Sequence, residues 1–281
     1  MEDRSLLRPG KPVVVGEGVR RLVAGNPGMM TGPGTNTYLF GSGVVAVLDP
    51  GPADPQHLGA ILDSAVGAIR WVLVTHTHPD HSPLACELAR ISGAELIGLP
   101  PPGDGRQDLS FRPTHVPRDG EVLALGSTHL VAIHTPGHAS NCICYLHADS
   151  RLLFSGDHVL EGVTPVILPP DGDMRAYLHS IGKLEALDFD RIAPGHGGVI
   201  ESGKSMLAML RQHRMMREAR VLAAMQALGP ADIEALTARV YDDVPVERHG
   251  WARLTLEAHL LKLEHEHRVS HKGAVWSLME R

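Results

Sequence analysis

The stretch Trp71-Val72-Leu73-Val74-Thr75-His76-Thr77-His78-Pro79-Asp80-His81 decides the fold. Its first five residues are apolar or β-branched, which is typical of a buried strand, and the chain then passes directly into four ligand-type side chains. His76 and His78 are two residues apart, so in an extended segment they project to the same side. Pro79 turns the chain, so Asp80 and His81 can point to a second, adjacent position. Imidazole and carboxylate groups suit zinc, iron or manganese, and the stretch therefore predicts a metal site at a strand end.

Three later segments repeat this design of an apolar strand that ends in glycine and a ligand. Their ends read Thr135-Pro136-Gly137-His138, Ser155-Gly156-Asp157 and Pro194-Gly195-His196. Glycine lets the backbone turn tightly and approach closely, because it has no Cβ to clash. One such segment would be an ordinary turn with a polar tip. Three of them in order after the first cluster predict that His138, Asp157 and His196 join it in one metal site.

Short strand patterns bounded by Gly/Pro turns fill the first two thirds of the chain, with helical patterns between some of them. The strand candidates are residues 13–23, 37–40, 44–48, 71–75, 95–99, 121–125, 129–134, 142–146, 152–155 and 191–193, and the helical patterns are 55–68, 83–92 and 174–187. Gly41-Ser42-Gly43 and Asp119-Gly120 are the expected hairpin turns. This mixture predicts an α/β sandwich in which helices cover sheets.

The pattern changes after Gly203. Residues 204–228 form one long helical pattern that Gly229-Pro230 closes, and shorter helical patterns follow at 232–240 and 252–269. The end of the chain predicts a hairpin that turns at Lys272-Gly273. We therefore expect a first domain over residues 1–203 and a small winged-helix-like domain over residues 204–281.

Composition limits the classes of function. Hydrophobic residues make up 43% and charged residues 21%, as in ordinary globular proteins, and the net charge of -6 argues against strong sequence-independent phosphate binding. The three cysteines do not predict a disulfide framework, and no apolar run is long enough to span a membrane. The start Met1-Glu2-Asp3-Arg4-Ser5 leads into no apolar signal region, so a cytoplasmic location is expected.

The ordered motifs resemble those of the metallo-β-lactamase superfamily, whose signature is H-x-H-x-D-H, then Gly-His, Gly-Asp and a final Gly-His. The resemblance covers about Leu22 to Glu201 and implies a four-layer αββα sandwich with the site at one edge of the two sheets. It also implies two divalent metal ions, with zinc expected and iron or manganese as alternatives. The implied ligands are His76, His78 and His138 for one ion, Asp80, His81 and His196 for the other, and Asp157 as the bridge.

This ligand set implies a hydrolase. Two divalent ions share a water and lower its pKa, so that hydroxide forms at neutral pH and attacks a carbonyl or phosphorus centre. Asp80 is the candidate catalytic residue, because it can take up the proton or orient the nucleophile as well as bind metal. The expected substrate is an ester, a thioester or a phosphodiester.

Two further residues are candidates for supporting roles. Asp49, in Val47-Leu48-Asp49-Pro50-Gly51, matches a family position at a strand end, and it either orients a ligand histidine or starts a turn before Pro-Gly. His158 follows Asp157 and either faces the site or packs beside it. His134 lies within a strand pattern and is expected to be structural.

Within the superfamily the chain resembles the lactamase-β-like protein 2 branch, which pairs this domain with a C-terminal winged helix. Asn26-Pro27-Gly28 and Gly34-Thr35-Asn36-Thr37-Tyr38-Leu39 carry the likeness. The branch includes endoribonuclease activity on single-stranded RNA, which is the alternative function. Asp157 stands where the best-known zinc β-lactamases carry Cys, so antibiotic hydrolysis is not expected. Cys142 stands where relatives often have His, and with Cys144 it is expected to pack in the core.

The expected partners are a small-molecule or RNA substrate and no membrane, and a homo-oligomer is compatible with the sequence. In the last helical pattern Arg253, Lys262 and Arg268 alternate with Glu257, Glu264 and Glu266, so sequence-specific DNA binding is not expected. Arg211, Arg214, Arg217 and Arg220 form a stripe that could contact phosphate or a second subunit, but a solvated helix face is favoured. A non-catalytic nucleic-acid-binding module is the remaining hypothesis, and the complete ligand set argues against it.

Overall fold

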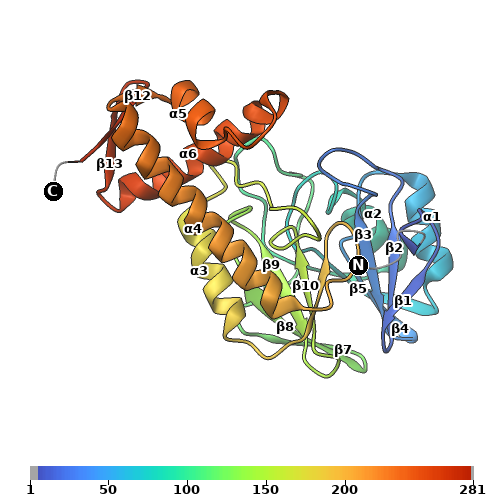
Figure 1. The fold of residues 1–281 in the computed structure, drawn as a ribbon. Coiled ribbons are helices and arrows are strands. Elements are labelled where there is room, and N and C mark those ends of the chain that lie inside the picture. The colour runs from blue at the N-terminus through green and yellow to red at the C-terminus, as the bar shows by residue number, and fades with distance from the viewer. Residues whose placement is uncertain (1–5, 280–281) are drawn as a thin grey trace.

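The computed structural model describes residues 6–279, so the first five residues, on which the expectation of no signal segment rests, lie outside the described residues. Within this range two sheets form the body of the protein (Figure 1). The first sheet has the order β1 (Val13–Gly16), β2 (Val19–Val23), β3 (Asn36–Phe40), β4 (Gly43–Leu48), β5 (Gly67–Leu73) and β6 (Glu95–Ile97). The second has the order β11 (Arg191–Pro194), β10 (Leu152–Gly156), β9 (Ile143–His147), β8 (Thr128–His134) and β7 (Val122–Leu125).

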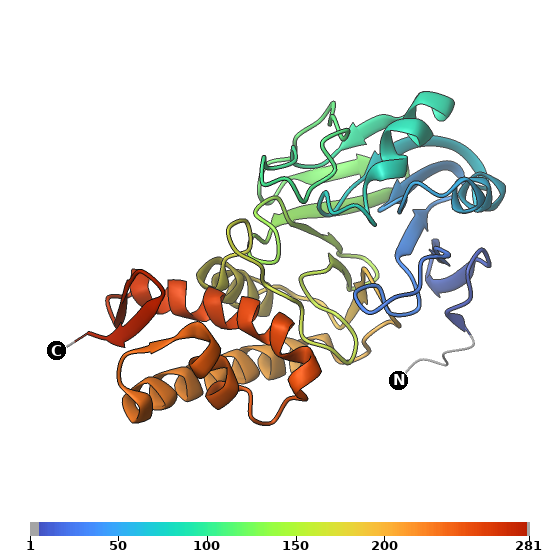
Figure 2. The same cartoon turned by 90° about the horizontal axis from the view of Figure 1, so that it is seen from above.

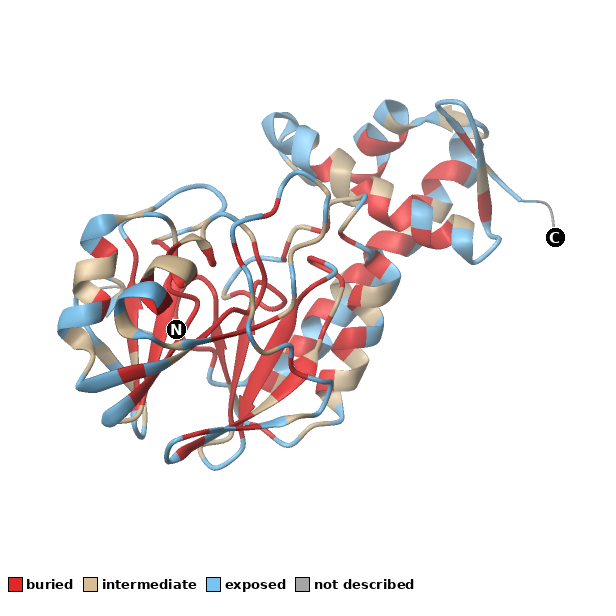
Figure 3. Cartoon of the chain, turned by 180° about the vertical axis from the view of Figure 1, so that it is seen from behind, coloured by how far each residue is buried: buried red, intermediate tan, exposed pale blue. Residues whose placement is uncertain are grey.

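Three apolar cores divide the sandwich into four layers. Between the sheets, the ring of Phe154 meets the rings of Tyr38 and Phe40 edge-on, each with centroids 4.9 Å apart. Helices α1 (Pro55–Ser64) and α2 (Pro83–Ser92) pack on the outer face of the first sheet. Helices α3 (Met174–Glu185) and α4 (Gly203–Leu228) pack on the second. Figure 3 shows the buried residues on the strands and on the helix faces that meet them. The predicted αββα sandwich is confirmed.

Strand direction brings the predicted ligand segments to one edge. Strands β4, β5 and β6 are parallel, and β8, β10 and β11 run in one direction because β9 is antiparallel to both β8 and β10. The sheets are joined at this edge, where the Ile143 N–H donates to the Thr75 carbonyl at 2.8 Å and the Asn36 N–H donates to the Gly195 carbonyl at 2.8 Å. The loops after β5, β8, β10 and β11 therefore meet at a single place.

The C-terminal unit combines helices with a small sheet (Figure 2). It contains α5 (Ile233–Val240), the 3₁₀ turn η2 (Val246–Arg248), α6 (His249–His265) and a sheet of β12 (Ala231–Asp232), β14 (Val275–Leu278) and β13 (Val269–Lys272). This arrangement is the predicted winged helix. Helix α4 serves two cores, because Leu207 and Leu210 pack against the sandwich while Val221 and Met225 pack in the C-terminal unit. The division between residues 203 and 204 stays a prediction.

Three local predictions were wrong. Residues 13–23 form a hairpin rather than one strand, because Gly18, with φ +66°, reverses the chain between β1 and β2. The helix from Pro55 ends at Ser64, and Gly67 then enters β5 so close to β4 that a Cβ there would lie 2.1 Å from the Gly43 carbonyl oxygen. Asp119-Gly120 leads into β7 and does not join two strands.

The arginine stripe of α4 is not a solvated face. Arg214 is 2% exposed and Arg217 is 9% exposed, whereas Arg211 lies on the surface. Arg217 forms ion-paired hydrogen bonds of 2.8 and 3.2 Å with the carboxylate of Asp243. The two arginines between the ends of the stripe therefore belong to the packed interior. Cys142 and Cys144 are buried as expected for core residues.

None of the helices in residues 6–279 is both long enough and apolar enough to cross a membrane.

Candidate metal centre

Three histidines from two loops converge at the edge of the sandwich. His76 and His78 follow β5, and His138 follows β8. Nδ1 of His78 lies 2.9 Å from Nε2 of His76 and 3.0 Å from Nε2 of His138. Zinc binds imidazole nitrogen at about 2.0–2.1 Å, so a small outward adjustment of these three nitrogens would accommodate one ion between them.

A second group lies beside the first. Oδ2 of Asp80 is 3.3 Å from Nε2 of His81 and 3.2 Å from Nε2 of His196. Asp157 lies between the two groups: its Oδ1 is 3.4 Å from Nε2 of His81, and its Oδ2 is 3.3 Å from Nε2 of His196 and 3.8 Å from Nε2 of His138. The structure thus brings all seven predicted ligands together.

The glycines before the ligands have a steric role. A Cβ on Gly195 would lie 2.4 Å from Oδ1 of Asp157 and 2.8 Å from Cε1 of His81. Gly156 has φ +50°, and a Cβ there would lie 2.5 Å from the hydroxyl of Thr75. Any larger residue at these positions would displace a candidate ligand or Thr75, which explains the Gly-ligand pattern in the sequence.

Hydrogen bonds on the far side of the histidine rings orient them. Nδ1 of His81 meets Oδ2 of Asp49 at 3.0 Å, as expected if Asp49 orients a ligand histidine. Nδ1 of His138 donates to the carbonyl of Val166 at 2.7 Å, and Nδ1 of His196 donates to the carbonyl of Gly34 at 3.2 Å. A ring that donates from Nδ1 presents Nε2 as the ligand atom, and such outer hydrogen bonds are typical of metal-binding histidines.

Thr35 contacts the centre but was not predicted to. Its hydroxyl donates to Oδ2 of Asp80 at 3.1 Å and accepts from the side-chain amide of Asn26 at 3.0 Å. Asn26 and Thr35 belong to motifs that carried the family likeness, which was the only signal that could have identified them. His158 packs its ring against Tyr177, with centroids 4.7 Å apart, and its ring nitrogens have no hydrogen-bond partner within the described chain.

Burial and neighbouring charges shift the pKa values of the histidines in opposite directions in the two groups of candidate ligands. Burial, together with the neighbouring histidines, lowers the pKa of His76 well below its usual value and that of His78 to about 3. Burial alone would also lower the pKa of His196, but the charge of Asp157 and hydrogen bonds to Asp157 and Asp80 raise it to about 10. His76 and His78 are therefore neutral imidazoles, whereas the carboxylates of Asp157 and Asp80 favour positive charge beside them at His196.

The centre fits metal ions on its own geometry. Nε2 of His81 and Oδ1 of Asp157 are buried and lie 3.4 Å apart, but neither forms a hydrogen bond among residues 6–279, and a cation bound by both atoms would satisfy them. The ligand atoms form three overlapping sets in which they lie within 4.8 Å of one another. An imidazole and carboxylate donor set of this kind is suited to divalent transition metals.

Comparison with known proteins agrees with this fold and centre. Residues 30–196 match the metallo-beta-lactamase superfamily profile, and the chain belongs to this superfamily of hydrolases. Residues 233–276 match the beta-lactamase associated winged helix domain. The beta-lactamase-like protein 2 homolog of Drosophila melanogaster is 31% identical over 268 residues, which cover 88% of each chain. The two profile matches on this chain give the domain pairing predicted from the sequence.

Two further relatives add information on activity and fold. An atrochrysone carboxyl ACP thioesterase of Aspergillus chevalieri is 31% identical over 81% of this chain and 74% of its own. The crystal structure of a metallo-beta-lactamase family protein from Thermus thermophilus has a TM-score of 0.79 at 20% identity, covering 95% of this chain and 100% of that one. At that identity the solved structure supports the fold alone.

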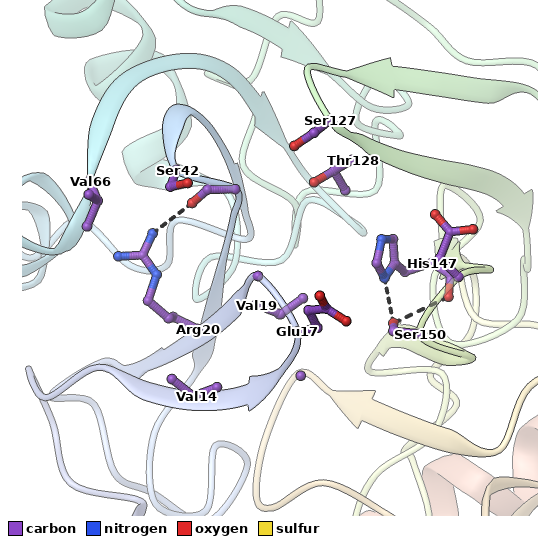
Figure 4. A pocket seen from close by; sticks show the side chains of 14 residues that line it. Val14, Glu17, Val19, Arg20, Ser42, Val66, Ser127, Thr128, His147 and Ser150 are labelled. Carbon is purple, nitrogen blue, oxygen red and sulfur yellow. Dashed lines mark hydrogen bonds between the residues drawn. The ribbon is translucent and has the colours of Figure 1, made fainter.

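A cleft of about 440 Å³ opens beside His196. Its lining is mainly apolar and includes Met29, Met30, Leu160 and Val163, and Glu161 is the one carboxylate among its lining residues. A larger hollow of about 620 Å³, shown in Figure 4, lies at the opposite ends of the strands. None of the candidate ligands lines that hollow, so the cleft beside His196 is the candidate substrate site.

Proposed function

We propose that the chain is a dinuclear metal-dependent hydrolase. His76, His78 and His138 would hold one ion, Asp80, His81 and His196 the other, and Asp157 would bridge them. The placement of Asp157 is the observation that carries this proposal, because its two oxygens lie against nitrogens of both groups. Zinc is the proposed metal, since the donor set suits it, with iron or manganese as alternatives.

Two divalent ions at this centre would acidify water and stabilise negative charge on the reacting group. Asp80 is proposed as the catalytic residue. Its side chain is 25% exposed, compared with 11% for Asp157, so it is the more accessible of the two carboxylates to a proton. The hydroxyl of Thr35 fixes Oδ2 of Asp80, and Asp49 fixes the ring of His81. These contacts hold the proton acceptor and its neighbours in place before substrate arrives.

The shape and charge of the cleft favour an acyl substrate. Its methionine, leucine and valine side chains suit an alkyl or aryl acyl group, and Glu161 would repel a polyanion. Two curated relatives, from Aspergillus chevalieri and Aspergillus fumigatus, carry the name atrochrysone carboxyl ACP thioesterase. We therefore propose hydrolysis of a thioester or ester, with the thioester preferred.

Endoribonuclease activity on single-stranded RNA is the second candidate. A separate hollow lined by Arg214 and Arg248 supports it, because these side chains supply positive charge of the kind that a phosphate backbone requires. The acidic cleft at the metal centre argues against it, so it ranks behind the thioester.

The test is metal analysis of the purified protein, followed by parallel assays on an acyl thioester, bis(p-nitrophenyl) phosphate and single-stranded RNA. We expect two metal equivalents and fastest turnover of the thioester. Asp157→Ala should lose metal and activity together, whereas His158→Gln, one residue away, should keep the metal. Full activity of Asp157→Ala would refute the proposed centre. Two metal equivalents without turnover of any substrate would favour a binding module.

A further inference from the structure

Residues 163–166 lie beside two hollows that meet at Val163. On one side is the cleft beside His196, and on the other is a hollow of about 340 Å³ between α4, α6 and the turn that precedes α6. Val163 lines both hollows. Val166 lines the second one, and its carbonyl accepts the hydrogen bond from Nδ1 of His138. The second hollow is thus one residue away from a candidate metal ligand.

The second hollow is cationic in a chain whose net charge is -6. Three arginines and His213 line it, and none of its lining residues is a carboxylate. Arg217 is compensated, because Asp243 accepts two hydrogen bonds from it. Arg248 is exposed and forms no ion pair within residues 6–279.

Arg214 forms the floor of this hollow and lacks a counter-charge. Its side chain is buried, its Nη2 donates to the carbonyl of Pro165, and its guanidinium lies 5.3 Å from the ring centre of Tyr177. Its Nε has no hydrogen-bond partner, and no carboxylate in the described part of the chain forms an ion pair with it. A buried cation without an opposite charge is unfavourable, so the fold retains a positive potential here that an anionic ligand would neutralise.

The other residues that line this hollow indicate what kind of group would accompany the anion. Trp251 is 41% exposed, and Tyr241, Val244 and Ala252 complete an apolar and aromatic surface beside the arginines. Such a surface suits an uncharged organic arm attached to an anion. A free inorganic anion would leave it unused.

We propose that this hollow binds the terminal phosphate of the thiol arm of a thioester substrate; this inference rests on the proposed thioesterase function. The acyl group lies in the cleft beside His196, and the arm crosses Val163 to reach Arg248 and Arg214. In the reaction, water adds to the thioester carbonyl, the carbon–sulfur bond breaks, and the products are a carboxylic acid and a thiol. The phosphate takes no part in the bond changes, so the hollow contributes binding and positioning.

The test compares two acyl thioesters that differ only in one group: an S-acyl pantetheine and the corresponding S-acyl 4′-phosphopantetheine. With the unmodified protein we expect kcat/KM to be at least about tenfold higher for the phosphorylated thioester, mainly through KM, as for a charge-assisted contact. Arg248→Ala should reduce this ratio to near one. Arg239→Ala is the matched control, because Arg239 is an exposed arginine of the same unit that does not line the hollow. It should leave both rates unchanged.

Arg214→Met provides a second variant, in which the buried cation is replaced by a side chain of similar length. It should also abolish the preference for the phosphorylated thioester. If this variant fails to fold, the result with Arg248→Ala still decides the question.

The outcomes separate this inference from the proposed function. Equal rates on both thioesters, or a preference that survives in Arg248→Ala, would overturn the inference while leaving thioester hydrolysis established. If neither thioester is hydrolysed, the proposed function fails, and calorimetric titration with pyrophosphate then tests the hollow directly: binding that Arg248→Ala abolishes supports it, and no binding overturns it. RNA cleavage that depends on Arg248, without any phosphate preference among thioesters, would also overturn it.

Discussion

Asp49 and His81 are joined by a 3.0 Å hydrogen bond between Oδ2 and Nδ1, and the same carboxylate accepts two 2.7 Å hydrogen bonds from Thr75. The carboxylate is 2% exposed and lies on a residue with φ +50°. Asp49, which directly follows β4, thus holds both Thr75 and the ring of the candidate ligand His81. This contact fixes Nε2 of His81 toward Asp80 and Asp157.

Asp49→Asn should therefore weaken metal binding without unfolding the protein. The amide keeps the shape of the carboxylate but loses its charge, and loss of such an outer partner typically reduces metal affinity about 10- to 100-fold. Competition with a chelator of known affinity measures the change. Asp54→Asn is the control, because Asp54 caps α1 and asparagine caps equally well. Unchanged affinity in Asp49→Asn would show that the bond does not support the metal centre.

Thr35→Val should lower kcat, because it removes the hydroxyl that donates to Asp80 at nearly constant side-chain volume. A hydrogen bond to a charged group contributes about 1.5–3 kcal/mol, which corresponds to roughly a 10- to 100-fold loss of rate. Thr35→Ser keeps the donor and should retain most of the activity. Steady-state kinetics at full metal loading make the comparison, and equal kcat for the two variants would contradict it.

His138 and His134 lie four residues apart, and we expect their substitution to have opposite effects on metal content. His138→Ala should remove metal and activity, because Nε2 of His138 faces His78 and Asp157. His134→Gln should keep the metal, because its ring bonds to the carbonyl of Pro117 and contacts none of the candidate ligands. Elemental analysis of both purified variants distinguishes them. Retention of two metal equivalents by His138→Ala would exclude His138 as a ligand.

His259 should make the fold sensitive to acid. Burial, with the positive charges of Arg214 and Lys262, lowers the pKa of His259 from 6.5 to about 3. The folded state therefore keeps this ring neutral while the unfolded state takes up a proton below pH 6.5. Its contribution to the free energy of unfolding is complete above that pH and declines as the pH falls toward 3, by up to about 1.4 kcal/mol per unit.

Urea unfolding of the wild-type protein and of His259→Leu between pH 4 and pH 7 tests this expectation. The other titrating groups are common to both proteins. The difference between the two proteins in the slope of the free energy of unfolding against pH is therefore due to His259. Parallel curves for the two proteins would show that His259 is protonated in the folded state.

The candidate metal ligands could be predicted from the sequence because each lies within eight residues after the end of a strand. The local pattern of apolar residues, glycine and ligand, as at Gly156 and Asp157, contains the information needed. Strands that run in the same direction have their carboxyl ends at the same edge of a sheet, so the residues that follow these strands come together. The outer contacts were harder to predict, since Thr35 reaches Asp80 across 45 positions and depends on the conformation of the intervening loops.

The burial of the arginines of α4, unlike the placement of the candidate ligands, was not predicted from the sequence. A spacing of three residues and high polarity are typical of a solvated face, yet Arg214 and Arg217 are buried. Their burial depends on segments distant in sequence: the carbonyl of Pro165 for Arg214 and the carboxylate of Asp243 for Arg217. Helical periodicity alone contains no information about such partners.

Helix α4 also constrains how substrate can enter. Its 26 residues extend for about 39 Å without interruption, and its two halves are packed into separate cores. Rotating the C-terminal unit away from the sandwich would require the helix to bend or one core to break. We therefore expect the two units to tumble as one rigid body in solution, and access to the candidate metal centre to depend on the loops around Met30 and Val163.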